Sequence, residues 1–251
     1  MRRRIDFNCD LGEGCGSDAA IMPHVSSASI ACGGHAGDAG SMRATVDLCL
    51  RHGVTVGAHP SFEDREHFGR RELALPGDEI RALVERQVEA LATVCEAAGA
   101  RLRHVKPHGA LYNLAARDAV VAAVIADAVR AFDPSLLLYG LSGSATMAAA
   151  NAAGLRGVHE VFAERRYEAD GRLTPRNEPG AVIEGIDAAL AQVRGMLGEG
   201  IVVARTGERV PIHADSLCLH GDRPDAAAFA SALRAALEAD GIEVAAPGDL
   251  A

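Results

Sequence analysis

Short apolar runs alternate with longer segments of helical periodicity along the whole chain. The clearest helix is predicted over residues 78–98, where Ile80, Leu83 and further apolar residues recur at spacings of three and four. Asp78 suits its N-cap, and Gly99 suits the position after its last turn. Strands are predicted at residues 5–9, 28–32, 54–58, 102–106, 136–140, 157–162 and 216–220. Helices are predicted near residues 38–52, 78–98, 117–131, 143–153, 181–197 and 224–239.

This alternation predicts an α/β fold with parallel strands and right-handed crossover connections. Two layouts fit it: a closed barrel and an open doubly wound sheet. The glycine-rich turn LGEGCG (11–16) lacks the GxGxxG spacing of a dinucleotide-binding sheet. No linker or repeat divides the chain, so we expect a single domain over residues 1–251. Residues 164–180 form a long polar loop, and loops of that length in a compact domain are often functional.

Polar side chains follow nearly every predicted strand on its C-terminal side. In VKPHGALYN (105–113), Lys106 and His108 lie two residues apart and should project to the same face where a strand ends. In a parallel barrel these strand ends meet at one face, where the active sites of such barrels lie. The sequence therefore favours the barrel and places Lys106 in a solvated mouth, where its loss would leave folding intact. The polar residues are Asp10 and Glu13, His35 and Asp38, His59, Lys106 and His108, Arg165 and Arg166, and His220 and Asp222.

Composition and charge narrow the classes of partner. With 49% hydrophobic and 24% charged residues, the chain is typical of a soluble globular protein. The net charge of −9, with no basic block beyond the Arg2–Arg4 tip, argues against a nucleic-acid partner. The N-terminus lacks the apolar segment of a secretory signal, and the most apolar window, 119–129, is too short to cross a membrane. We therefore expect a cytoplasmic protein with no membrane partner.

The six cysteines form no CxxC pair, which argues against a zinc ribbon or a disulfide framework. Most are expected to be buried as small hydrophobic residues. Cys218 shares strand parity with His220, so it is the candidate for a reactive thiol.

Several motifs are distinctive in combination: NCDLGE (8–13), ASIACGGHAGD (28–38), GAHPSFED (57–64) with FGRR (68–71), VKPHGALYN (105–113), FAERRY (162–167) and LCLHGD (217–222). Together they resemble the motif series of the LamB/YcsF family, whose members are known as the A subunit of 5-oxoprolinase. The match runs in order from the first predicted strand to the last. One departure is Gly34, where many relatives carry phenylalanine, and it predicts a more open wall beside His35.

The resemblance implies a (β/α)7 TIM-like parallel barrel of the glycoside hydrolase and deacetylase type. It also implies ATP-dependent hydrolysis of 5-oxoproline (pyroglutamate) to L-glutamate, carried out together with two partner subunits. The sequence lacks the GxxxxGK(S/T) phosphate loop. Phosphoryl activation would then belong to the partners, with ATP consumed by the complex. Binding of ATP in the barrel mouth of this chain, by another pattern, is left open.

Hydrolysis of an amide requires a base for water, a proton donor for the leaving nitrogen and stabilisation of the oxyanion. Neighbouring groups can tune carboxylates and imidazoles toward neutral pH. The acid and base candidates are therefore Asp10, Glu13, His59 and His108. Lys106 carries a compact charge suited to an oxyanion. The predicted substrate-binding residues, which include two arginines suited to a carboxylate or a phosphate, are Asn8, His35, Arg165, Arg176, His220 and Asp222.

A requirement for a divalent metal is left open by the residues. Asp10, His59 and His108 would make an oxygen and two nitrogen ligands suited to Zn²⁺ with an open position, as in the deacetylases that the barrel resembles. No HExxH spacing supports this set. Two alternatives to a 5-oxoprolinase component therefore stand. One is a metal-dependent deacetylase-type hydrolase that ignores ATP, and the other is a non-catalytic barrel that binds a small acid and serves its partners as a scaffold.

Overall fold

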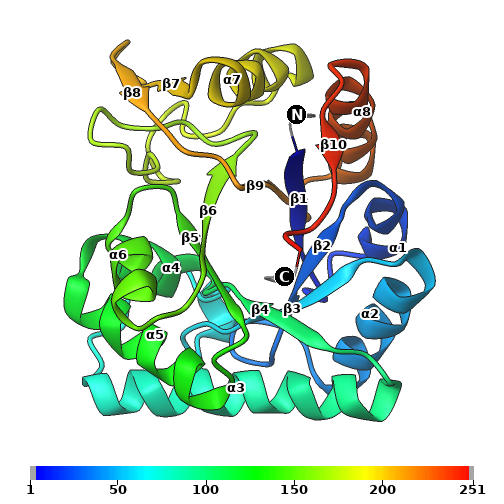
Figure 1. The fold of residues 1–251 in the computed structure, drawn as a ribbon, viewed down its shortest axis with the longest axis vertical. Helices are drawn as coiled ribbons and strands as arrows, with labels where there is room; N and C mark the ends of the chain where they lie inside the picture. Colours follow the sequence, from blue (N-terminus) through cyan, green and yellow to red (C-terminus); the bar gives the residue numbers. More distant parts are fainter. Residues whose placement is uncertain (1–3, 249–251) are drawn as a thin grey trace.

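Seven parallel strands close into a barrel in the computed structural model, which describes residues 4–248 (Figure 1). Six of them pair in chain order, and β9 pairs with both β6 and β1, which closes the ring. The barrel strands are β1 (Arg4–Leu11), β2 (Ser27–Ala31), β3 (Thr55–His59), β4 (Leu102–Val105), β5 (Leu137–Leu141), β6 (Gly157–Phe162) and β9 (Ser216–His220). The predicted parallel barrel is confirmed. Arg2 and Arg3 of the basic tip, and both ends of the predicted 1–251 domain, lie outside the described residues.

Helices pack around the outside of the barrel. The long helix α3 buries Ile80, Leu83 and further residues of the predicted apolar stripe. It begins at Gly77, so its cap residue is Pro76 rather than Asp78. Its last residue is Ala98, and the following Gly99 has a φ of 71°, which favours glycine. The described helices of eight or more residues are α2 (Ala39–His52), α3 (Gly77–Ala98), α4 (Gly109–Arg117), α5 (Ala119–Phe132), α6 (Ala145–Ala152), α7 (Ile186–Glu199) and α8 (Ala226–Ala239).

The predicted helix over 117–131 corresponds to α5, and α4 precedes it as a separate helix. Asp118 separates the two, because its backbone is extended and its carboxylate accepts hydrogen bonds from the backbone N–H groups of Val120 and Val121. The α4 helix begins directly after His108, which places this histidine at the N-cap. The end of β4 is thus followed by a short turn and a helix, which fix the direction of His108.

Within residues 4–248, no single helix has both the length and the apolar character needed to cross a membrane. The α4 and α5 helices meet those criteria only as a pair, and they are bent by 115° relative to each other.

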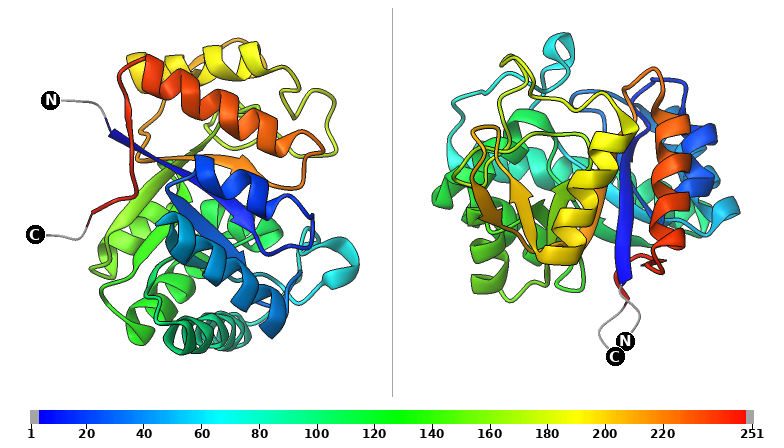
Figure 2. Two further views of the ribbon diagram at one scale, coloured as in Figure 1. Left: turned by 90° about the vertical axis from the view of Figure 1, so that its right-hand side faces the viewer. Right: turned by 90° about the horizontal axis from the view of Figure 1, so that it is seen from above.

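Three further strands extend the fold beyond the barrel. β10 (Glu243–Val244) pairs with the start of β1, and β7 (Ile201–Val203) forms an antiparallel hairpin with β8 (Arg209–Pro211). Figure 2 shows α7 and α8 lying side by side on the outside of the barrel. The predicted polar loop 164–180 lies between β6 and α7, where two isolated β-bridges hold it.

Polar side chains line the inside of the barrel. Asp6, Asn8 and Asp10 are buried at alternate positions of β1, so they share one face of the strand. Asp6 accepts a hydrogen bond from Tyr139 of β5, and Asn8 accepts one from Lys106 beyond β4, although neither strand is next to β1. These bonds therefore cross the interior. Branched apolar side chains usually fill a parallel barrel, so a polar interior indicates a specialised role.

Candidate active site

A pocket of about 620 Å³ lies at the carboxyl ends of the barrel strands. This volume is within the range of about 300–1,000 Å³ that is typical of small-molecule sites. The predicted site residues that line it are Asp10, His59, Lys106, His108, Arg165, Arg176 and His220. The other four, Asn8, Glu13, His35 and Asp222, contact residues that line it. The fold thus brings together side chains from seven separate motifs and loops.

Lys106 is buried in the floor of this pocket, with 1% of its surface exposed. Its Nζ lies 2.5 Å from Asp10 Oδ1 and 2.8 Å from Glu160 Oε1. It also donates a 2.8 Å hydrogen bond to Asn8 Oδ1. Burial opposes charge on the amine, but the carboxylates of Asp10 and Glu160 raise the pKa of Lys106 well above its usual value. The expectation of a solvated lysine was wrong, because the long side chain lies inside the barrel between two carboxylates.

Glu160 belongs to this network and was not singled out from the sequence. It lies within β6 with 0% exposure, and its Oε1 accepts hydrogen bonds from Lys106 and Asn8. Two signals could have revealed the network. One is a glutamate inside the apolar run GVHEVF, and the other is that Lys106 is the only lysine among 25 lysine and arginine residues. Every other residue of this pair of types is arginine, so the compact ammonium group of Lys106 at a buried position is distinctive.

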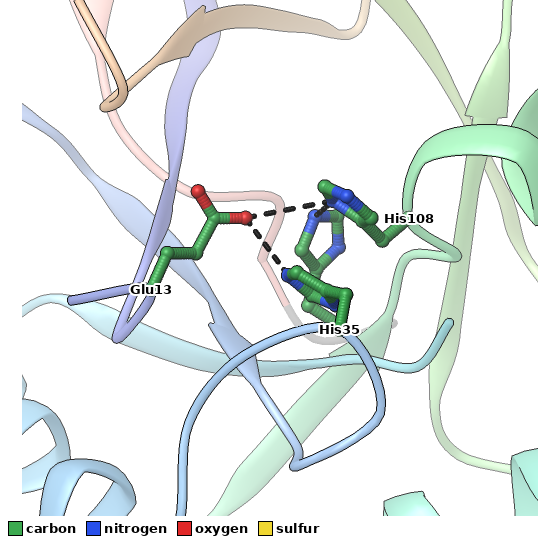
Figure 3. A group of neighbouring side chains, drawn as sticks. Glu13, His35 and His108 are labelled. Carbon is green, nitrogen blue, oxygen red and sulfur yellow. Dashed lines mark hydrogen bonds and ion pairs between the residues drawn. The ribbon is translucent and has the colours of Figure 1, made fainter. Parts of the chain in front are cut away.

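Three histidines and a glutamate converge beside Lys106, and we call them the histidine–glutamate cluster: Glu13, His35, His59 and His108. Figure 3 shows the Glu13 carboxylate facing His35 and His108, with its Oε1 3.0 Å from His35 Nε2 and 3.5 Å from His108 Nδ1. His59 Nε2 lies 2.9 Å from His108 Nδ1 and 3.3 Å from Asp10 Oδ2. One ligand atom from each of the four residues lies within 4.8 Å of the others, so the cluster could hold a metal ion.

Two imidazoles of this cluster, those of His35 and His108, resist protonation because they are buried. Burial and the neighbouring His59 lower the pKa of His35 to about 2. Burial, followed by His35 and His59, also lowers the pKa of His108 well below its usual value. The rings of His35 and His108 stack with their centroids 3.6 Å apart. At neutral pH, these two rings are therefore neutral.

The two carboxylates nearest the cluster have opposite pKa shifts. Burial, then Asp10 and Asp222, raise the pKa of Glu13 well above its usual value. Burial also acts to raise the pKa of Asp10, but His59 and Lys106 outweigh it and hold that pKa well below the usual range. Asp10 is therefore ionised at neutral pH, whereas Glu13 resists negative charge unless a proton or a cation lies beside it.

Gly34 does not open the wall beside His35, so that expectation was wrong. A Cβ atom at Gly34 would lie 2.5 Å from Ser61 Oγ and 2.6 Å from Gln87 Oε1, so these side chains already fill the space. Ser61 Oγ in turn lies 2.9 Å from His35 Nδ1. Glycine at this position lets Ser61 approach the His35 ring closely.

Arginines give the pocket positive charge near the 164–180 loop. Arg165 is 4% exposed, and its Nη2 donates to Thr174 O at 2.6 Å, while its Nε has no hydrogen-bond partner within residues 4–248. Burial and Arg176 lower the pKa of Arg165 to about 10, so it remains charged at neutral pH. Arg176 is exposed. Arg70 also lines the pocket and pairs with Asp222 at 2.5 Å. The Asp222 carboxylate therefore faces Arg70 of the same chain.

His220 and Cys218 lie on β9 at this end of the barrel. His220 forms an ion pair with the buried Glu164, and this contact lowers the pKa of Glu164 against the effect of burial. Burial raises the pKa of the Cys218 thiol well above its usual value, although Lys106 donates to its sulfur at 3.3 Å. A buried thiol that keeps its proton is a poor nucleophile, so Cys218 has a packing role.

The model of the LamB/YcsF family matches residues 5–251. The chain belongs to this family. It is 53% identical over 249 residues to the 5-oxoprolinase A subunit of Bordetella pertussis, covering 97% of this chain and 99% of that protein. It is 52% identical, with the same coverage, to a 5-oxoprolinase A subunit of Bordetella bronchiseptica. Membership of the LamB/YcsF family therefore confirms the resemblance drawn from the motifs.

Solved structures agree with this assignment to the LamB/YcsF family. The lactam utilization protein from Thermus thermophilus aligns with a TM-score of 0.90 and 46% identity, covering 97% of this chain and 100% of that one. The peptidoglycan deacetylase PdaC from Bacillus subtilis aligns with a TM-score of 0.52 at 12% identity, covering 98% of this chain and 88% of that one. The second likeness concerns the fold alone, and it matches the predicted deacetylase-type barrel.

Proposed function

We propose that this chain is the lactam-opening component of an ATP-dependent 5-oxoprolinase, which converts 5-oxoproline to L-glutamate together with two partner subunits. The names of the similar Bordetella and Thermus proteins support this substrate class. The observation that carries the proposal is the meeting of Lys106, Asp10 and the histidine–glutamate cluster at one small-molecule pocket. Together these groups supply the charge and the proton-transfer chemistry that amide hydrolysis requires.

Substrate binding is assigned to the arginines and to Lys106. Arg165 and Arg176 line the pocket with positive charge and suit the carboxylate of 5-oxoproline. This contact would leave the lactam carbonyl to face Lys106, whose ammonium group is held by Asp10 and Glu160. As water adds to the activated carbon, the fixed positive charge stabilises the negative charge on the phosphorylated lactam oxygen.

Proton transfer is assigned to Asp10, Glu13, His59 and His108. One of these groups removes a proton from the attacking water, and another gives a proton to the ring nitrogen as the C–N bond breaks. His59 and His108 both line the pocket, and His59 Nε2 lies 2.9 Å from His108 Nδ1 and 3.3 Å from Asp10 Oδ2. A positioned acid or base of this kind contributes about 10²–10⁴-fold to the rate.

ATP acts through the partner subunits in this proposal. The sequence lacks the phosphate loop of P-loop nucleotide-binding proteins. Phosphoryl activation of the lactam oxygen is therefore assigned to the partners. On this chain, one water adds to the activated carbon and the C–N bond breaks, which leaves an acyl phosphate. A second water then releases inorganic phosphate and L-glutamate. The requirement for ATP also places the reaction in the cytoplasm.

The test is an assay of L-glutamate release from 5-oxoproline and ATP, with this chain and the two partner subunits supplied singly and in every combination. We expect release only when all three subunits and ATP are present. Release that ignores the presence of this chain would contradict the proposal. ATP-independent release by the isolated chain would remove the assigned role of the partners.

A metal-dependent hydrolase of the deacetylase type is the second candidate, and the histidine–glutamate cluster is the observation that favours it. It predicts that the isolated chain removes acetyl groups from acetylated amino sugars without ATP and loses this activity in a chelator. The same preparation, assayed for both reactions, separates the two candidates.

A further inference from the structure

The protonation of His59 and His108 is fixed by the backbone. His59 Nδ1 lies 2.7 Å from the carbonyl oxygen of Lys106, and His108 Nε2 lies 2.9 Å from that of Phe68. A carbonyl oxygen can only accept a hydrogen bond, so each of these ring nitrogens carries the proton. When both rings are neutral, the other nitrogens, His59 Nε2 and His108 Nδ1, therefore present lone pairs to each other at 2.9 Å.

The tautomer of His35 is fixed in the same way, through a hydroxyl group. Ser61 Oγ donates its single proton to the carbonyl oxygen of Phe62 at 3.0 Å. It therefore accepts the 2.9 Å bond from His35 Nδ1, which leaves a lone pair on His35 Nε2. That lone pair faces an oxygen of Glu13 at 3.0 Å.

Four acceptor atoms thus point at one another in a buried space: His35 Nε2, His59 Nε2, His108 Nδ1 and Glu13 Oε1. Such contacts repel unless positive charge lies between them. Two shared protons could relieve them, one between His59 and His108 and one between His35 and Glu13. A single divalent cation between the four atoms would relieve all of these contacts, since the atoms lie within 4.8 Å of one another.

We propose that Glu13, His35, His59 and His108 hold one divalent first-row transition-metal ion, such as Zn²⁺. Three imidazole nitrogens and one carboxylate oxygen form a donor set that suits such ions. Metal bonds of about 2.0–2.2 Å place neighbouring ligand atoms about 3–3.5 Å apart, and three of the ligand pairs lie at 2.9, 3.0 and 3.5 Å. The proposal goes beyond the 5-oxoprolinase assignment and does not depend on it. With the ion bound, Glu13, His59 and His108 would serve as ligands, and of the four proton-transfer candidates Asp10 would keep that role.

The surroundings of the cluster have the form of an outer coordination shell. Ligating histidines commonly donate their second ring N–H to a carbonyl or another oxygen, which fixes the ring and its tautomer. Each of the three histidines here does so, toward Lys106 O, Ser61 Oγ or Phe68 O. Asp10 Oδ2, which lies 3.3 Å from His59 Nε2, stands next to the cluster. Since His59 and His108 line the pocket, the ion would supply Lewis-acid chemistry at its floor.

Binding is tested on the full-length chain after dialysis against a chelator. Zn²⁺ and Co²⁺ are titrated in by isothermal calorimetry, and the metal content is measured by elemental analysis after gel filtration. We expect about one tightly held ion per chain, visible absorption bands for bound Co²⁺, and a melting temperature that rises when metal is added. His35→Ala should weaken binding at least a hundredfold, because it removes a ligand. His52→Ala, at an exposed position on α2, should bind as the wild type does.

A second variant keeps the test decisive if His35→Ala does not fold. Ser61→Ala keeps all four ligands and removes the hydroxyl group that accepts from His35 Nδ1 and donates to Phe62 O, so metal affinity should fall about 10–100-fold. Binding of fewer than one ion per ten chains by the wild type at micromolar metal would overturn the proposal. So would Co²⁺ absorption that is unchanged in both variants. Glutamate release is measured in parallel, so the loss of this proposal would leave the 5-oxoprolinase assignment standing.

Discussion

Two groups of buried polar residues occupy the same barrel, and they are satisfied in different ways. Near the amino ends of the strands lies what we call the lower layer: Asp6, Ser26, Ser27, Tyr139 and Ser216. Its carboxylate, Asp6, accepts hydrogen bonds from all four hydroxyl groups, including those of Tyr139 at 2.9 Å and Ser216 at 2.6 Å. Every acceptor of that carboxylate meets a donor. The lower layer is complete without any ligand.

The histidine–glutamate cluster, at the carboxyl ends of the strands, differs from the lower layer because its acceptor atoms are not matched by donors. Its nitrogen and oxygen acceptors face one another, and their donors are directed outward to the backbone and to Ser61. Burial of polar groups is costly unless partners are present, so the cluster requires a proton, an ion or a substrate. The comparison shows that burial alone does not distinguish structural from functional polar groups. The balance of donors and acceptors does.

Replacing Lys106 should have the largest effect, because its ammonium group neutralises the buried carboxylates of Asp10 and Glu160 between the lower layer and the histidine–glutamate cluster. We expect Lys106→Met to lower glutamate release about a hundredfold or more, in line with the loss of one oxyanion donor. It also leaves Asp10 and Glu160 buried without their cation, so unfolding free energy should fall by about 3–5 kcal/mol. Turnover per folded molecule and urea unfolding measure the two effects separately.

The control for this variant is the double change Lys106→Met with Glu160→Gln. Removing one of the two uncompensated charges should recover part of the lost stability, whereas turnover should stay low because the ammonium group is still absent. If Lys106→Met releases glutamate at nearly the wild-type rate within an assembled complex, Lys106 has a structural role only.

Changing the lower layer should separate stability from activity. Asp6→Asn replaces an acceptor oxygen with a donor that faces hydroxyl donors, so we expect a loss of about 1–3 kcal/mol in unfolding free energy. Glutamate release per folded molecule should be unchanged, because Asp6 does not line the pocket. Asp127→Asn, on the exposed surface of α5, should change stability by less than about 0.5 kcal/mol. A fall in turnover at full stability would place Asp6 in the active site.

Stability should also depend on pH through His104, which is fully buried beside the lower layer. Burial, then Lys106 and His59, lower its pKa to about 3, against about 6.5 for an unfolded histidine. As pH falls below 6.5 the unfolded chain binds a proton that the folded chain refuses. The contribution of His104 is therefore complete above pH 6.5 and lost as pH falls toward 3, at up to about 1.4 kcal/mol per pH unit.

Urea unfolding of the wild type and of His104→Gln at several pH values between 7 and 4.5 measures this contribution. The slope of unfolding free energy against pH should be smaller in the variant, because His104 no longer contributes to it. The slope should not fall to zero, since other buried histidines still contribute. Equal slopes would mean that His104 is protonated as readily in the folded chain as in the unfolded one.

The strands and the one-sided polar ends were predictable because they depend on local patterns. Apolar runs bounded by turns mark strands, and parallel connections bring their carboxyl ends to one face. The positions of Asp10, His59 and His108 followed from that reasoning. Glu160 and Asp6 did not, because their importance depends on which strands face each other across the barrel. That relation is set by closure of the sheet, which no short window of sequence contains.

The burial of Lys106 and the orientation of the histidines could not be predicted from the sequence either. A lysine beyond a strand end can extend into solvent or into the barrel, and here Asp10 and Glu160 draw it inward. The tautomers depend on carbonyl groups of Lys106 and Phe68, whose direction is fixed only once the loops have folded. The extra helix α4 was not predicted, because its nine residues begin only two positions after Pro107 and form a short segment of their own before α5.

The smallest effect is expected for Arg176, an exposed residue of the pocket wall that belongs neither to the lower layer nor to the histidine–glutamate cluster. Arg176→Gln should raise the KM for 5-oxoproline about tenfold, since a hydrogen bond to a charged group contributes about 1.5–3 kcal/mol. The kcat should be unchanged, because binding of the substrate carboxylate is the same in the ground state and the transition state. Arg172→Gln is the matched control: Arg172 lines the same pocket but pairs with Asp170 at 2.5 Å, so its loss should alter KM little. Steady-state kinetics of the assembled complex measure both variants. A KM that rises equally in the two would indicate a general effect of positive charge on the pocket, and a fall in kcat for Arg176→Gln would bring this arginine into the reaction itself.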